Sequence, residues 1–230
     1  MDIFSQHEVF EIEVLDRMNS AKVLEPLVFG GGTMLRLCHE LKRYSVDLDF
    51  WFIKKIPQKK YFDSIVKALE KSYEITDAEI KHYTLLIELR SAEYPKRLKI
   101  EIRKELKDCD YQEKIAFSKS STKQVLLKAH TLEQTMKNKI LAFLDRGEIR
   151  DCFDIEFILR RGTDLPGEFR EECIEFQKKI VRFKDVDFKV KLGSILEKDI
   201  RDYYVENRFS LLEEKLTAMI SNPQIPPRKS

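Results

Sequence analysis

Apolar and polar residues follow two different periods along the chain, and they divide it into a mixed part and a helical part. Helical spacing in the first 24 residues and in residues 57–73 predicts a helix in each stretch. A further short helix is predicted where three glycines, 30–32, end an apolar run. Alternation and short apolar runs predict five strands, which cover residues 27–29, 46–53, 82–90, 97–104 and 125–127. The third and fourth of these strands are spaced as a hairpin with a long turn.

From residue 131 the spacing of apolar residues is helical almost to the end of the chain. Thr131 and Gln134 have the spacing of a capping box, and Gly147 is expected to end the helix that they begin. Further helices are predicted at residues 151–160, 168–182, 189–206 and 208–220. We therefore predict an α+β (α/β) fold with three parts, namely an α/β domain at 1–128, a helical domain at 129–222 and a loose tail at 223–230.

Composition narrows the class of protein. The 230 residues are 43% hydrophobic and 36% charged, which indicates a folded chain with a highly charged surface. Because 42 basic residues meet 40 acidic ones, the net charge is only +2, and a uniformly basic coat for nucleic acid is excluded. The four cysteines have no metal-ligand or disulfide spacing, and no apolar run is long enough to cross a membrane. These features predict a soluble, cytoplasmic protein with no membrane partner.

Two carboxylates follow the glycine-led helix. Asp47 and Asp49 are two residues apart on a predicted strand, so both project from the same face, about 7 Å apart. Carboxylates placed in this way can share Mg²⁺, and a pair of such ions can stabilise the attacking and leaving oxygens of phosphoryl or nucleotidyl transfer. Gly31 and Gly32 would let backbone N–H groups approach a polyphosphate at the start of a helix, where the helix dipole also favours anions.

Gly31, Gly32 and Thr33, followed by the sequence RYSVDLDF at residues 43–50, resemble the signature of the AbiEii/AbiGii-type nucleotidyltransferases. That family belongs to the polymerase-β-like nucleotidyltransferase superfamily, and the resemblance covers roughly residues 25 to 160. It implies a small mixed sheet flanked by helices, with an all-helical C-terminal region. It also implies transfer of an NMP from an NTP, dependent on Mg²⁺ or Mn²⁺, to an acceptor that in several members is tRNA. Some members are toxins of toxin–antitoxin or abortive-infection systems, so a cognate antitoxin is an expected partner.

A third carboxylate is expected on a neighbouring strand. Glu101 alternates with the apolar residues of its predicted strand and therefore points away from the core. The triplet Lys99-Ile100-Glu101 resembles the second motif of the family, which makes Glu101 the expected third ligand. Glu88, in the preceding predicted strand, alternates in the same way and is the substitute candidate.

A helical segment carries the last motif of the resemblance. Lys139, followed by Ala142 and then by the sequence RDCFD at 150–154, resembles the late motif of the family. By that resemblance Lys139 contacts the nucleotide phosphates, and Asp154 helps to build the active site with support from Arg150 and Asp151. Two alternatives involve Asp151, which could pair with Arg150 at the surface or cap its own helix.

Three residues near the carboxylates have roles that the sequence leaves open. Ser45 shares the face of Asp47, and its hydroxyl could bond a phosphate oxygen or orient that carboxylate. Thr33 could cap the glycine-led helix and touch phosphate. Arg43 could bind the anionic substrate or anchor the turn between helix and strand. The predicted set is thus Asp47, Asp49 and Glu101 for catalysis and metal, and Gly31, Gly32, Thr33, Ser45, Lys139, Arg150 and Asp154 for nucleotide.

The identity of the acceptor is not readable from the sequence. Basic residues gather at 96–104 and again at 119–128, where they could line an RNA path or be an ordinary solvated surface. A protein or small-molecule acceptor would need the same chemistry. A catalytically silent relative that binds nucleotide or partner proteins is the third alternative, and the complete set of acids argues against it.

Overall fold

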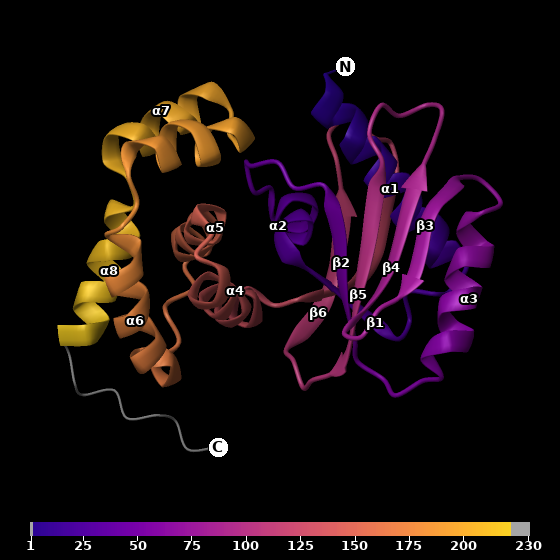
Figure 1. The fold of residues 1–230 in the computed structure, drawn as a ribbon, viewed down its shortest axis with the longest axis horizontal. Coiled ribbons are helices and arrows are strands. Elements are labelled where there is room, and N and C mark those ends of the chain that lie inside the picture. The colour runs from indigo at the N-terminus through magenta and orange to yellow at the C-terminus, as the bar shows by residue number, and fades with distance from the viewer. Residues whose placement is uncertain (1, 222–230) are drawn as a thin grey trace. The chain divides into compact units, whose positions relative to one another are not determined.

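The computed structural model describes residues 2–221, which fold into two compact units (Figure 1). The first unit holds residues up to 40 together with 44–130, and the second holds 131–221 together with the short segment 41–43. The sequence assigned that short segment to the α/β domain at 1–128. The predicted tail, 223–230, lies outside the described residues.

The first unit is built on one seven-stranded sheet with the order β3-β4-β5-β2-β1-β7-β6. Two neighbouring pairs, β2 with β5 and β1 with β7, are parallel, and the other pairs are antiparallel. The predicted mixed sheet is therefore confirmed. The strands are β1 (Leu27–Gly30), β2 (Asp47–Phe52), β3 (Glu74–Ile80), β4 (Thr84–Arg90), β5 (Leu98–Leu106), β6 (Tyr111–Phe117) and β7 (Gln124–His130).

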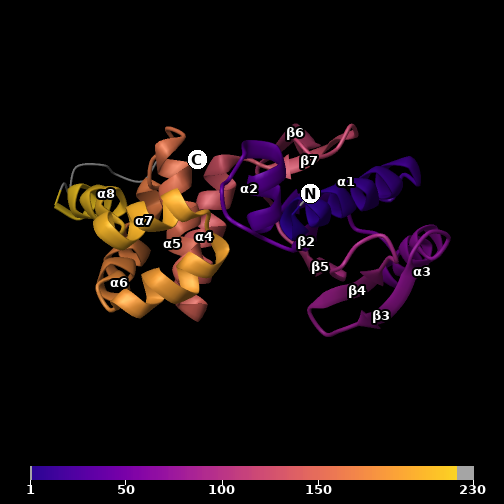
Figure 2. The same cartoon turned by 90° about the horizontal axis from the view of Figure 1, so that it is seen from above.

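Three helices accompany the sheet. They are α1 (Ile3–Ser20), α2 (Gly31–His39) and α3 (Gln58–Leu69). Seen from above, α1 lies across one face of the sheet with α3 beside its C-terminal end (Figure 2). The alternation in β2 explains this arrangement, because Leu48, Phe50 and Phe52 are buried while the residues between them are partly exposed.

The sequence missed two strands, β3 and β6, although it predicted the hairpin of β4 and β5 correctly. Both missed strands lie at the edges of the sheet. An edge strand has one free side and mostly exposed residues here, so its sequence needs no apolar pattern. Hydrophobic periodicity is therefore a weak signal for edge strands such as β3 and β6, whose residues are mostly exposed.

The second unit is helical. Its helices are α4 (Leu132–Arg146), α5 (Ile149–Arg160), α6 (Arg170–Ile180), α7 (Lys198–Asn207) and α8 (Ser210–Ser221). The predicted boundaries of α4 are confirmed, because the Thr131 hydroxyl accepts from the Gln134 N–H at 3.1 Å and Gly147 ends the helix at φ +68°. The prediction of one helix at 189–206 is wrong. Short helical turns at Asp187–Leu192 and Gly193–Ile195 end at Leu196, which is extended and forms a β-bridge with Arg43.

Within residues 2–221, no helix combines the length and the apolar character that crossing a bilayer requires.

Candidate active site

The predicted acidic residues of the first unit lie on one face of two adjacent strands. In the parallel pairing of β2 with β5, Asp49 is directly opposite Glu101 and Asp47 is opposite Lys99. Side chains opposite each other in a sheet point to the same side, so both aspartates and Glu101 share that face. The sheet register thus brings together three carboxylates that are 54 residues apart at most in the chain.

Lys99 lies among these carboxylates. Its ammonium nitrogen is 2.9 Å from Glu101 Oε1 and 3.8 Å from Asp47 Oδ2. Among residues 2–221, no three metal-ligating side chains are close enough to form a ready metal site. The chemistry of the donors nevertheless fits a hard divalent cation, since all are carboxylate oxygens and a cationic group already sits between two of them.

Glu88 is on the same face of the sheet but one strand farther from Asp49, because its partner in the β4–β5 pairing is Lys99. Its carboxylate accepts hydrogen bonds from the Thr76 hydroxyl and from Arg97, both at 2.7 Å. These two hydrogen bonds lower the pKa of Glu88. The geometry therefore favours Glu101 as the neighbour of the aspartates.

The start of α2 lies against Asp49. Gly31 has φ +75°, and a Cβ atom there would be 2.3 Å from Asp49 Oδ2, so only glycine fits. The N-cap residue of α2 is Gly30, which makes no side-chain hydrogen bond, so the interpretation of Thr33 as a cap is wrong. Thr33 is completely buried instead, and its hydroxyl has no hydrogen-bond partner within residues 2–221.

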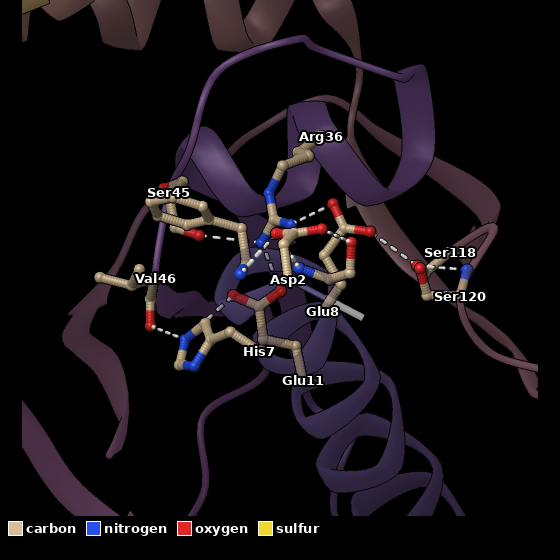
Figure 3. Close-up of polar contacts among 11 residues, drawn as sticks. Asp2, His7, Glu8, Glu11, Arg36, Ser45, Val46, Ser118 and Ser120 are labelled. Carbon is tan, nitrogen blue, oxygen red and sulfur yellow. Dashed lines mark hydrogen bonds and ion pairs between the residues drawn. The ribbon is translucent and has the colours of Figure 1, made fainter. Parts of the chain in front are cut away.

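A buried polar network holds the backbone that leads to Asp47 (Figure 3). The Arg36 guanidinium donates to the carbonyl oxygen of Ser45 at 2.8 Å, and the Nε2 of His7 is 3.2 Å from that of Val46. The same guanidinium pairs with Glu8 and Glu11 of α1. Helices α1 and α2 thereby fix the two peptide units that precede Asp47.

Glu11 is the most perturbed carboxyl of this network. Its side chain is completely buried, and this burial raises its pKa to about 8 despite the neighbouring Arg36. Burial also lowers the pKa of His7, whose Nε2 lies 3.5 Å from Glu11 Oε1. Sequence reasoning missed this network. The available signal was the presence of His7 and Glu11, one turn apart, on the face of α1 that also carries core residues.

The helical unit contains the remaining predicted residues. The Lys139 ammonium is 2.6 Å from Asp154 Oδ2 and 3.2 Å from Asp151 Oδ1. Arg43 donates to Asp154 as well, at 2.6 Å through Nη2, so Arg43 anchors its segment to α5. Burial alone would raise the pKa of Asp154, but these two cations lower it below its ordinary value.

Asp151 differs from both alternatives that the sequence offered. It is completely buried and accepts from Arg146 at 2.6 and 2.8 Å, whereas Arg150 is exposed. The N-cap of α5 is Glu148 and makes no side-chain hydrogen bond. A surface pair with Arg150 and a capping role for Asp151 are therefore both wrong, and Arg146 is the partner that the sequence missed. The nucleotide-binding roles of Lys139, Arg150 and Asp154 stay predictions.

Comparisons with known proteins agree with this fold. The model of a family described as "Nucleotidyl transferase AbiEii toxin, Type IV TA system" matches residues 13–202. The structure of JHP933 from Helicobacter pylori is similar with a TM-score of 0.53 and 19% identity, over 90% of this chain and 91% of that one. The nucleotidyltransferase toxin MenT4 of Mycobacterium tuberculosis is similar with a TM-score of 0.51 and 15% identity, over 92% and 89% of the two chains. No curated protein matches the sequence.

Proposed function

The chain belongs to the AbiEii family of nucleotidyltransferase toxins and is itself a nucleotidyltransferase, and we propose that it transfers the NMP of an NTP to a hydroxyl group of tRNA. The observation that carries the proposal is the single face on which Asp47, Asp49 and Glu101 lie, next to the glycine start of α2. Carboxylates beside a helix N-terminus are suited to a substrate that carries both phosphates and bound cations.

Asp47, Asp49 and Glu101 are the residues that would hold Mg²⁺ or Mn²⁺. Such an ion, when bound, neutralises charge on the phosphates and assists the departure of pyrophosphate. Lys99 would have to release Glu101 and Asp47 to make room for it, because its ammonium lies within 4 Å of both. The chain therefore carries its own cation in the place where the metal is expected.

The other residues bind and orient the substrate in this proposal. Gly31 and Gly32 present backbone N–H groups of the first turn of α2 to the triphosphate, and the Ser45 hydroxyl donates to a phosphate oxygen. The acceptor hydroxyl attacks the α-phosphorus, the bond from that phosphorus to the bridging oxygen breaks, and pyrophosphate leaves. Glu101 takes the proton of the acceptor hydroxyl.

In the helical unit we propose that Lys139 contributes to binding of the nucleotide phosphates, with Arg150 and Asp154 in support. Lysine is a compact counter-charge for phosphate, and the pairing of Lys139 with two carboxylates keeps its side chain in one orientation. Replacement by methionine should weaken NTP binding. An unchanged NTP affinity in that variant would remove Lys139 from the proposal.

The family description also bears on partners and location. Because it names a type IV toxin–antitoxin system, we propose that a cognate antitoxin protein opposes this enzyme in the cell. We further propose that both act in the cytoplasm, where the NTP and tRNA are available.

The test is transfer of label from each of four α-³²P NTPs, with Mg²⁺, to total tRNA and to whole-cell protein. Asp47→Asn and Asp49→Asn variants serve as controls that keep side-chain size. Label on tRNA that is absent with both variants supports the proposal. Label on protein or on a small molecule instead would replace tRNA as the acceptor, and no transfer despite NTP binding would indicate a silent relative.

A further inference from the structure

An open hollow of about 620 Å³ lies in the first unit, away from the carboxylates. It is lined by α3, by the turn between α1 and β1, and by the segment after β2, in the region where α3 lies beside the C-terminal end of α1 (Figure 1, Figure 2). Its walls include apolar surface from Val23, Ile56 and the Tyr61 ring. No sequence motif pointed to this hollow.

The rim of the hollow is strongly basic. Five lysines line it, against a single acidic residue, Glu25, so the local balance is +4, whereas the whole chain has a net charge of +2. All five are exposed, and within residues 2–221 none of them forms an ion pair. They are Lys22, Lys54, Lys60, Lys67 and Lys71. Like charges gathered in this way repel one another, and a bound anion would relieve the repulsion.

The spacing of the lysines favours an extended anion over a single phosphate. Lys60 and Lys67 lie on one face of α3, and Lys71 lies two residues beyond its end, so that at about 1.5 Å per residue the three span about 16 Å. One phosphate can reach only one or two of these ammonium groups. A chain of phosphates can run along the whole row, and its nucleosides can pack on the apolar walls.

The position of the hollow fits the same ligand. Its lining includes Pro26, just before β1, and Lys54, just after β2, whereas Gly30 ends β1 beside Asp49. Four to six strand residues, at about 3.3 Å each, therefore separate the hollow from the carboxylates by roughly 13 to 20 Å along the strands. A mononucleotide cannot bridge that distance, but a polynucleotide can.

We infer that this lysine-lined hollow binds the phosphate backbone of the RNA acceptor, at a distance from the reacting hydroxyl. The inference deepens the proposed function and rests on RNA as its acceptor. Lysine contacts to phosphates release counterions, so the hollow should contribute to affinity in a manner that depends on salt and not on sequence.

The test is the salt dependence of binding to fluorescein-labelled total tRNA, measured by anisotropy between 50 and 300 mM NaCl with the full chain. The hollow variant carries Lys60→Gln, Lys67→Gln and Lys71→Gln. The control variant carries Lys178→Gln, Lys184→Gln and Lys198→Gln, three exposed positions of the second unit, and loses the same charge. Thermal melting of both variants checks that they remain folded.

We expect the slope of log K against log salt to become shallower by about two to three units in the hollow variant, at about 0.7–0.9 per phosphate contact. The control variant should change it by much less. Equal changes in the two variants would mean that only overall charge matters, and an unchanged slope would mean that RNA does not bind here. Either result overturns the inference. Loss of polyglutamate binding in the hollow variant, with tRNA binding intact, would also overturn the inference, because the occupant would then be an acidic protein.

The Asp47→Asn variant separates this inference from the proposed function. It should bind tRNA with the wild-type slope while transfer is lost. If the wild-type enzyme labels no RNA but the salt slope of tRNA binding is shallower in the hollow variant, the hollow still binds RNA and tRNA is refuted as the acceptor. If the wild-type enzyme labels tRNA but the hollow variant has the wild-type salt slope, the proposed function stands and only the inference about the hollow is refuted.

Discussion

Gly31 is held against Asp49, since a Cβ atom on this glycine would lie 2.3 Å from the carboxylate oxygen Oδ2. The contact joins the first residue of α2 to the middle of the acidic face, and the two residues are 18 positions apart in the chain. A substitution at Gly31 would therefore have to move a proposed catalytic carboxylate.

Gly31→Ala should lower the transfer rate by about 100-fold, the cost of a misplacement near 1 Å in an active site. Gly147→Ala is the matched control, because Gly147 has φ +68° but open space around its Cβ position. That control should lose only about 1 kcal/mol of unfolding free energy, the cost of a left-handed conformation. Steady-state rates and urea denaturation of both variants measure the two effects. Equal activity losses would show that backbone strain, and not the contact with Asp49, is responsible.

Glu101→Gln should lower transfer by about 100-fold or more, as expected for a group that moves a proton in the transition state. Glu88→Gln should stay close to the wild-type rate, because Glu88 is held by Thr76 and Arg97 one strand away. The two substitutions are chemically identical, so the comparison tests position alone. A larger loss in the Glu88 variant would transfer the role of third carboxylate to it.

Lys99→Gln should reduce the Mg²⁺ concentration that gives half-maximal transfer. The ammonium of Lys99 lies 2.9 Å from Glu101 and competes with a metal for the same oxygens. Lys99→Arg retains the charge and is the control, in which the Mg²⁺ requirement should stay high. The measurement is the transfer rate over a Mg²⁺ titration at saturating NTP. A Lys99→Gln enzyme that needs more Mg²⁺ than wild type would contradict competition.

Glu11 should make the protein less stable as the pH rises. Burial raises its folded-state pKa to about 8 from an ordinary value of 4.5, so the folded state holds the proton more tightly. Its contribution to stability is complete below pH 4.5, declines between pH 4.5 and 8, and is lost above pH 8. The side chain in Glu11→Gln stays neutral at every pH. The free energy of unfolding of this variant should therefore rise relative to that of the wild type as the pH rises, by about 1.4 kcal/mol for each unit of difference between the folded and unfolded pKa of Glu11.

Urea denaturation of wild type and Glu11→Gln at pH 5, 6.5 and 8 measures this gain. Burial lowers the pKa of His7, which is the opposite direction, and because its Nε2 lies 3.5 Å from Glu11 Oε1 the measured difference reports the coupled pair. Glu70→Gln, at an exposed position, is the control and should show no such trend. Parallel stability curves for wild type and Glu11→Gln would mean that Glu11 is ionised throughout.

Asp154→Asn should destabilise the helical unit by about 3–5 kcal/mol, because the buried cations Arg43 and Lys139 would lose their shared partner. Asp164→Asn removes a carboxylate from an exposed pair with Lys215 and should cost less than about 1 kcal/mol. Thermal or urea unfolding compares the two. A small effect of Asp154→Asn on stability, with a large one on NTP binding, would show that Asp154 acts mainly on the nucleotide.

The alternation in β2 was sufficient to predict that Asp47 and Asp49 share a face, and Thr131 and Gly147 were sufficient to predict the ends of α4. These features depend on residues close together in the chain. The edge strands β3 and β6 and the break before α7 were not predictable in the same way. The edge strands carry little apolar pattern, and the break depends on a bridge between Leu196 and the distant Arg43.

The sequence by itself determined the local chemistry of this protein, namely the glycine turn, the pair of aspartates and the order of the motifs. Only the tertiary structure decided which groups meet. It placed Glu101 opposite Asp49 and Glu88 a strand away, set Lys99 among the carboxylates, and buried Glu11 beneath Arg36. The physical reason is that pairing between distant strands and burial in a shared core depend on the packing of the whole unit, which local periodicity does not encode.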